Sequence, residues 1–142
     1  MSEPEGRSLP EWPAGTVGLL VTPGPHAIPI STGVRAADDR LVFGLARRRS
    51  TLARLRADPR AAFALLAEGL AFTAYGEVRV LREQLERVPT VAALELWVDR
   101  VQDHLAEART EILAAPAWRW TEEEARKADA QVRSELEELA RG

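Results

Sequence analysis

The first part of the chain carries short apolar or alternating runs separated by Gly, Pro and Asp, a pattern typical of β-strands. The runs are residues 17–21, 27–35, 41–46, 61–67 and 70–82. We predict a strand for each, with the first two joined as a hairpin by the turn at 22–25. Pro29 lacks an N–H and restricts the second strand to an edge or bulge position, while residues 41–46 are apolar enough for burial on both faces.

Two segments predict helices. Residues 50–58 place Leu52 and Leu55 on one face, with Ser50 as the expected N-cap and Pro59 as the stop. A longer helix is expected from Thr121, which with Glu124 forms a capping box, to Ala140. Its narrow apolar face is expected to dock on the strands or on another subunit, and includes Ala125, Val132, Leu136 and Leu139.

Residues 91–105 fit both patterns, because Leu94, Leu96 and Val98 alternate while other apolar residues follow a helical stripe. Periodicity leaves this segment open. Gly76, after Tyr75, interrupts a strand pattern and predicts a β-bulge. Five strands around one short helix favour a small barrel.

Composition excludes several classes of protein. The 142 residues include two histidines and no cysteine, and the net charge of the chain is −3. Disulfide scaffolds, thiol nucleophiles and cysteine-ligated metals are therefore excluded, and we expect a cytoplasmic protein without a metal site. No run reaches the roughly 18 apolar residues of a membrane span. The sequence also has no Rossmann or P-loop fingerprint and no acid–base or nucleophile constellation.

Positive charge is concentrated in one block, since residues 35–60 hold eight arginines and three aspartates. Within it, Arg47-Arg48-Arg49-Ser50-Thr51 stands at the expected start of the first helix. Backbone N–H groups, the helix dipole, guanidinium groups and hydroxyls together suit a phosphate. The alternative is a solvated basic loop that pairs with the acidic C-terminal region. These residues alone support a phosphate site and a solvated loop equally well.

Other polar and aromatic residues have two interpretations each. His26 is a ligand-facing donor or, more simply, a turn residue. Ser31 and Thr32 face either a polar ligand or solvent. Trp97, Trp118 and Trp120 are expected to pack or to anchor the tail, although they also mark where substrate specificity would be sought.

A resemblance to a known family narrows these choices. The run LVFGLARRRSTLARLRADPRAAF, residues 41–63, with HAIPIS before it and AFTAYGEVRV after it, resembles the FMN-binding split-barrel proteins, the pyridoxamine 5′-phosphate oxidase-like family. The resemblance covers roughly residues 15–105. It implies a mainly β (α+β) fold: a six-stranded split β-barrel with a short helix after the third strand and a C-terminal helix. Residues 91–104 become the sixth strand.

The resemblance also implies a domain division and a site. The divisions are an N-terminal extension (1–14), a split-barrel flavin-binding domain (15–108), and a linker with the C-terminal helix (109–142). The residues implied to contact the cofactor are Ile30, Ser31 and Thr32 beside the flavin ring, and Gly44, Leu45, Ala46, Arg47, Arg48, Arg49, Ser50 and Thr51 along the flavin and its phosphate. The family often has Ser-Arg-Lys where this chain has Arg49-Ser50-Thr51, so Arg47 and Arg48 are expected to compensate.

The function that follows is an FMN-binding oxidoreductase, acting on an unspecified small-molecule substrate as a homodimer with the cofactor at the subunit interface. A deazaflavin-dependent reductase on the same fold and a non-enzymatic flavin sensor or carrier are the alternatives. The negative net charge argues against a nucleic-acid partner.

Overall fold

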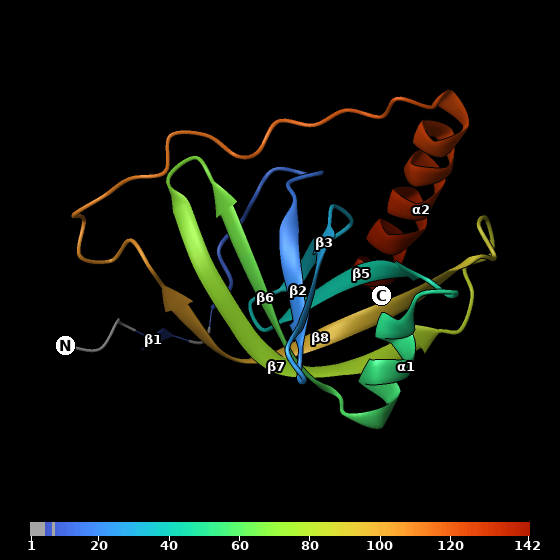
Figure 1. Ribbon diagram of the computed structural model, residues 1–142, viewed down its shortest axis with the longest axis horizontal. Coiled ribbons are helices and arrows are strands. Elements are labelled where there is room, and N and C mark those ends of the chain that lie inside the picture. The colour runs from blue at the N-terminus through green and yellow to red at the C-terminus, as the bar shows by residue number, and fades with distance from the viewer. Residues whose placement is uncertain (1–4, 7) are drawn as a thin grey trace.

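The computed structural model describes residues 5, 6 and 8–142. Antiparallel strands dominate it, and two helices lie outside the sheet (Figure 1). The strands are β1 (Glu5–Gly6), β2 (Gly18–Thr22), β3 (His26–Ile30), β4 (Val34–Ala37), β5 (Arg40–Ala46), β6 (Arg60–Ala67), β7 (Leu70–Arg82) and β8 (Val91–Asp103). The helices are α1 (Ser50–Ala57) and α2 (Glu123–Arg141). The mainly β class and the existence of both helices are confirmed.

The predicted six-stranded barrel needs correction. Seven strands form one curved, open sheet in the order β3-β2-β6-β7-β8-β5-β4, and β1 pairs with the far end of β8. Within the described residues, the edge strands β3 and β4 are not paired with each other. The extra strand arises because the predicted strand 27–35 divides into β3 and β4.

The division of that strand has a local cause at Thr32. Its Oγ1 accepts a hydrogen bond from the backbone N–H of Gly44 at 3.1 Å and donates one to the carbonyl of Gly44 at 3.3 Å. The hydroxyl thus takes a place that a strand backbone would otherwise fill beside β5. Sequence alternation does not reveal such a side-chain substitute for strand pairing.

The long strands β7 and β8 hold the centre of the sheet. Their register shifts between Tyr75 and Gly76, as the bulge prediction requires. A Cβ at Gly76 would lie 1.8 Å from the carbonyl oxygen of Trp97, so only glycine fits this close backbone approach. Residues 91–103 are a strand, which resolves the ambiguous segment as the resemblance implied.

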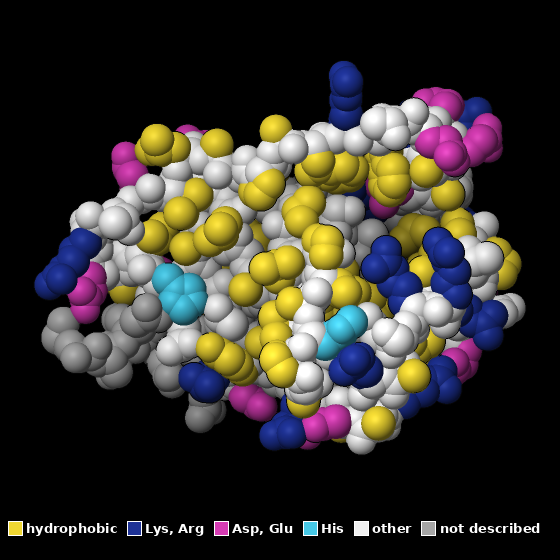
Figure 2. All heavy atoms as spheres, in the orientation of Figure 1, with side chains coloured by type: hydrophobic (Ala, Val, Ile, Leu, Met, Phe, Trp, Pro, Cys, Tyr) yellow, Lys and Arg dark blue, Asp and Glu magenta, His cyan; other side chains and the backbone are white. Residues whose placement is uncertain are grey.

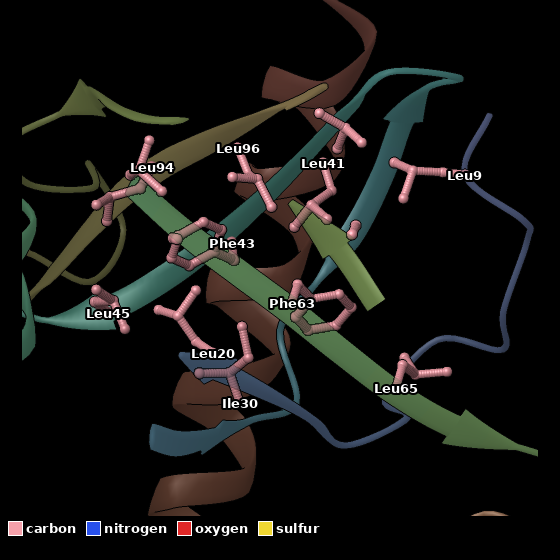
Figure 3. Packing of buried hydrophobic residues seen from close by; sticks show 14 of the residues in the cluster. Leu9, Leu20, Ile30, Leu41, Phe43, Leu45, Phe63, Leu65, Leu94 and Leu96 are labelled. Carbon is pink, nitrogen blue, oxygen red and sulfur yellow. The ribbon is translucent and has the colours of Figure 1, made fainter. Parts of the chain in front are cut away.

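The main core fills the concave side of the sheet (Figure 3). Fully buried side chains from β2, β5, β6 and β8 meet there, including Leu20, Phe43, Phe63 and Leu94. The N-terminal extension contributes to this core as well. Leu9 is buried, and Trp12 packs against Phe63 and Phe72 with ring centroids 5.9 and 5.6 Å apart.

Helix α2 packs on the opposite face of β4 and β5, so β5 is buried on both sides, as predicted for residues 41–46. Val132 and Leu136 pack against Val42 and Ala93. The carboxylate of Glu135, with its side chain 3% exposed, accepts hydrogen bonds from Arg82 at 3.1 Å and from the backbone N–H groups of Glu86 and Arg87 at 2.9 and 3.0 Å.

This contact affects the acid–base behaviour of Glu135. Burial raises the pKa of the carboxyl, but the two backbone N–H groups and the Arg82 guanidinium lower it further, and the net pKa lies below its usual value. The ionised carboxylate therefore joins α2 to the loop between β7 and β8. The sequence pattern gave no sign of this connection, because a lone glutamate on a helix normally points to solvent.

Both predicted helix caps are wrong. Arg49 occupies the N-cap position of α1 and Ser50 is the first helical residue. Glu122 occupies the N-cap position of α2, so Thr121 and Glu124 form no capping box. Neither helix has a side-chain cap hydrogen bond among the described residues. In α2 the acidic residues Glu123 and Glu124 stand in the first turn instead, where they compensate the helix dipole.

Residues 104–122, the strap hereafter, have no helix or strand and cross from the end of β8 to α2 (Figure 1). Along the described ranges, 5–6 and 8–142, no helix is both long and apolar enough to cross a membrane.

Candidate functional site

Two adjoining cavities lie where β3, β5 and the start of α1 come together. The first, the β3/β5 cavity, has a volume of about 310 Å³; the second, the arginine cavity, has about 490 Å³. Arg49 lines both. Pockets for small molecules and cofactors usually measure about 300–1,000 Å³, so the pair is large enough for an extended ligand.

The β3/β5 cavity is mainly apolar. Its lining residues are Ile28, Pro29, Ile30, Ser31, Thr32, Gly44, Leu45, Ala46, Arg49, Val91, Trp120 and Val132. Among these described residues Arg49 carries the only charge. Such a cavity suits a flat, weakly polar ring that carries a negative group at the end nearest Arg49.

Gly44 lets neighbouring side chains pack closely on β5. A Cβ at this position would lie 3.1 Å from Cγ1 of Val91 and 3.3 Å from Cγ1 of Val132. Even a methyl group would be crowded here, so glycine allows the start of β8 and α2 to approach the β5 backbone. The Thr32 hydroxyl already exchanges two hydrogen bonds with Gly44, which leaves it one acceptor lone pair for a ligand.

The arginine cavity holds the basic block. Its lining residues are Arg47, Arg48, Arg49, Leu52, Ala53, Arg56 and Glu83. Arg56 is paired with Glu83, and Arg47 donates to Oε1 of Gln84 at 3.1 Å. Figure 2 shows Lys and Arg side chains gathered around α1 and the loop before it. Four arginines against one glutamate give the cavity a positive charge.

The start of α1 adds to this positive field. Its first turn contains no acidic residue, and no side-chain cap reaches its N–H groups in the part of the chain that the structure describes. Exposed first-turn N–H groups and the positive dipole end favour an anion. The arginine cavity therefore lies beside a helix start whose dipole adds to the positive charge of its side-chain donors.

The predicted site residues are mostly brought together. Ile30, Ser31, Thr32, Gly44, Leu45 and Ala46 line the β3/β5 cavity, Arg47 and Arg48 line the arginine cavity, and Arg49 joins them. Ser50 is exposed at the first position of α1. Thr51 is buried, and its Oγ1 lies 3.0 Å from Nε2 of His26. Thr51 and His26 thus hold α1 against the start of β3.

Val91 and Val132 were not predicted to line a site, and Trp120 was named only as a place where substrate specificity would be sought. Val91, Trp120 and Val132 come from the start of β8, the strap and α2. Val132 was assigned only to the apolar face of its helix, and that face does pack on the sheet. Nothing in the sequence placed the strap or α2 beside β5, because this proximity results from the tertiary fold.

The tryptophans separate into different environments. Trp120 lines the β3/β5 cavity. Trp118 anchors the strap, as an aromatic residue before a helix commonly does, and donates from Nε1 to the carbonyl of Gly15 at 2.9 Å. Trp97 donates from Nε1 to Glu95 at 2.8 Å, on the outer face of β8 and away from both cavities. Across the described residues no group of three His, Asp or Glu side chains is arranged to hold a metal ion.

The residues present fit a flavin with a phosphate tail. The mainly apolar β3/β5 cavity suits a flat ring, and the arginines beside it offer donors to a dianion.

Comparison with known proteins agrees with the predicted fold. No family model matches the chain, and no curated protein matches its sequence. Solved structures do match. A pyridoxamine 5′-phosphate oxidase-like protein of Lactobacillus delbrueckii has a TM-score of 0.58 at 12% identity, over 71% of this chain and 98% of the other.

A second such protein, from Listeria innocua, has a TM-score of 0.52 at 14% identity, over 63% of this chain and 88% of the other. An F420 reductase has a TM-score of 0.51 at 13% identity, over 62% and 90%. At these identities the likeness is one of fold, and the predicted resemblance is confirmed at that level: the chain has the fold of the FMN-binding split-barrel proteins.

Proposed function

We propose that this protein binds FMN and acts as a flavin-dependent oxidoreductase on a small-molecule substrate. The observation that carries the proposal is the pair of adjoining cavities joined by Arg49, one apolar and one lined by arginines. The fold shared with pyridoxamine 5′-phosphate oxidase-like proteins supports it.

In this proposal the isoalloxazine ring lies in the β3/β5 cavity, along Ile30–Thr32 and Gly44–Ala46. Arg47, Arg48 and Arg49, with the Ser50 hydroxyl and the first N–H groups of α1, bind the phosphate. Thr51 supports the site indirectly, by fixing α1 against His26.

The bound flavin would supply the hydride and electron transfer. The chain then supplies position and environment, which agrees with a site that contains no acid–base constellation. Apolar walls exclude water from the ring, and the arginines hold the phosphate end so that the ring keeps one orientation in the β3/β5 cavity.

A fluorescence titration of the purified protein with FMN tests the proposal. We expect saturable binding at one FMN per chain, and reduction of the bound flavin by NADH or NADPH if the protein is an enzyme. Binding without reduction would favour the non-enzymatic sensor or carrier. Absence of any FMN binding would exclude both versions.

A deazaflavin is the second candidate, because an F420 reductase shares the fold and the three arginines before α1 offer more positive charge than one phosphate needs. The same titration with the deazaflavin cofactor distinguishes the two. Tighter binding of the deazaflavin, together with colourless protein after purification, would favour this candidate over FMN.

We further propose that the protein is a homodimer. Apart from Arg60, which pairs with Asp58 at the start of β6, the outward positions of β2, β3 and β6 carry no charge, and Figure 2 shows hydrophobic side chains across this face. These positions are Leu19, Val21, Ala27, Pro29, Ala62, Ala64 and Leu66. A second copy can cover this face without burying an unpaired charge, and Pro29 brings it next to the β3/β5 cavity.

Light scattering during gel filtration tests the dimer. Leu19 and Leu66 are 46% and 50% exposed, so Leu19→Asp with Leu66→Asp should leave the fold intact and produce monomers. An unchanged dimer would place the interface elsewhere, and a monomeric wild-type protein would exclude it.

A further inference from the structure

The strap is a long irregular segment in a small domain. Loops of more than about 12–15 residues without secondary structure are uncommon unless they bind something or link domains. The strap instead connects β8 to a helix of the same domain, and it crosses above the sheet (Figure 1). Its length and its path across the sheet suggest that the strap binds something as well as connecting β8 to α2.

Contacts along its length hold the strap in a defined position. The carbonyl of Ile112 accepts from the N–H of Gly69 at 2.9 Å, Ala115 packs against the main core, and Trp118 donates to Gly15. The guanidinium of Arg133 lies 5.9 Å from the centre of the Trp118 ring. The strap is therefore fixed on both sides of its middle and just before Trp120.

Trp118 and Trp120 are in contact and equally exposed, but their surroundings differ. Their rings meet edge to face with centroids 5.5 Å apart, and each residue is 40% exposed. Of the two, Trp120 lines the β3/β5 cavity and Trp118 does not. A partly exposed tryptophan contributes less hydrophobic stabilisation than a buried one. Its exposed ring at the edge of a cavity is therefore available to contact a ligand.

We propose that Trp120 forms the outer wall of the β3/β5 cavity and contacts the flat ring bound there, so that the strap covers one face of the ring. This proposal rests on the proposed function. The other walls near Trp120 are aliphatic, from Val91 and Val132, and give the ring no aromatic partner on that side. Trp118 fixes the strap, and Trp120 meets the ligand.

Fluorescence of the bound flavin gives a direct test, since an indole in contact with an excited flavin quenches it by passing an electron that then returns. We expect strong quenching of FMN bound to the wild-type protein and a several-fold increase in bound FMN emission in Trp120→Phe. Trp118→Phe is the matched control, with the same residue type, exposure and segment, and should stay quenched. Trp120→Leu serves as a second variant, and thermal melting verifies folding of all three.

The outcomes separate this inference from the function on which it rests. Equal quenching in the wild-type protein and both Trp120 variants would overturn the role of Trp120 while leaving FMN binding intact. A rise in Trp118→Phe without a rise in Trp120→Phe would also overturn it. If the wild-type protein binds neither FMN nor the deazaflavin, which is read by the same method, the proposed function fails and this inference fails with it.

Discussion

The two helices begin in opposite ways. At the start of α2 the chain supplies its own negative charge, with Glu123 and Glu124 in the first turn and Glu123 paired with Arg126. At the start of α1 it supplies three arginines and no acid. Every helix start has unpaired N–H groups and a positive dipole end. The contrast indicates that α2 is complete within the chain, whereas α1 is arranged for an external anion.

The largest effect is expected from the arginines before α1. Replacing Arg47, Arg48 and Arg49 together by Ala removes charge-assisted hydrogen bonds to the phosphate, each contributing about 1.5–3 kcal/mol. Loss of two such bonds alone weakens binding by about a hundredfold or more. Calorimetric titration with FMN measures the change.

The control for that variant lies on α2. Arg126, Lys127 and Arg141 replaced together by Ala change the net charge equally on the helix that we regard as complete. FMN affinity should stay close to that of the wild-type protein. Similar losses in both triple variants would show that only overall charge matters and would remove the distinction between the helices.

The next effect concerns the attachment of α2. Glu135→Ala removes the acceptor for two backbone N–H groups and Arg82, and a buried donor left without a partner costs about 1–3 kcal/mol. The free energy of unfolding in urea should fall accordingly. Glu135→Gln keeps one carbonyl acceptor and should lose less. An unchanged unfolding midpoint in Glu135→Ala would mean that the carboxylate does not hold α2.

Acid should reveal the same contact. The pKa of Glu135 in the folded protein lies below the ordinary value of 4.5, so its ionised form stabilises the fold fully above that pH. The contribution disappears as the pH falls through the folded pKa. Melting temperatures measured from pH 7 to pH 3 should fall more steeply in the wild-type protein than in Glu135→Gln. Parallel curves would contradict the assignment.

The smallest effects separate two neighbouring hydroxyls on α1. Ser50→Ala should lower FMN affinity by about 0.5–1.5 kcal/mol, the contribution of one neutral hydrogen bond, without changing stability. Thr51→Val should do the reverse, because its hydroxyl is buried against His26. Equal effects of both variants on FMN binding would restore Thr51 to the phosphate site.

Much of the fold follows from local pattern. Alternation located β2, β5, β6 and β7 within a few residues, and the Gly76 bulge was predicted because glycine in a strand signals close backbone approach. The segment 91–103 needed the resemblance, since Leu94 and Val98 satisfy both periods. Helix caps failed because Ser50 and Thr121 are suitable residue types whose positions depend on where the flanking chain is held.

The residues of the candidate site likewise include some that the sequence indicated and some that only the structure revealed. The basic block was visible as a run of arginines, and Ile30–Thr32 and Gly44–Ala46 entered through the resemblance. Trp120 was named only among the residues where substrate specificity would be sought, and Val132 was not predictable as a cavity residue. The strap and α2 reach β5 only through long-range contacts such as that of Trp118 with Gly15. The separate places of Ser50 and Thr51 also depend on which face of α1 meets β3.

A crystal structure of the protein grown with FMN would test the central claim most directly. We predict the phosphate within hydrogen-bonding distance of Arg49 and the first N–H groups of α1, with the ring between β3, β5 and Trp120. A flavin bound elsewhere, with the side chains of Arg47, Arg48 and Arg49 all turned to solvent, would contradict it.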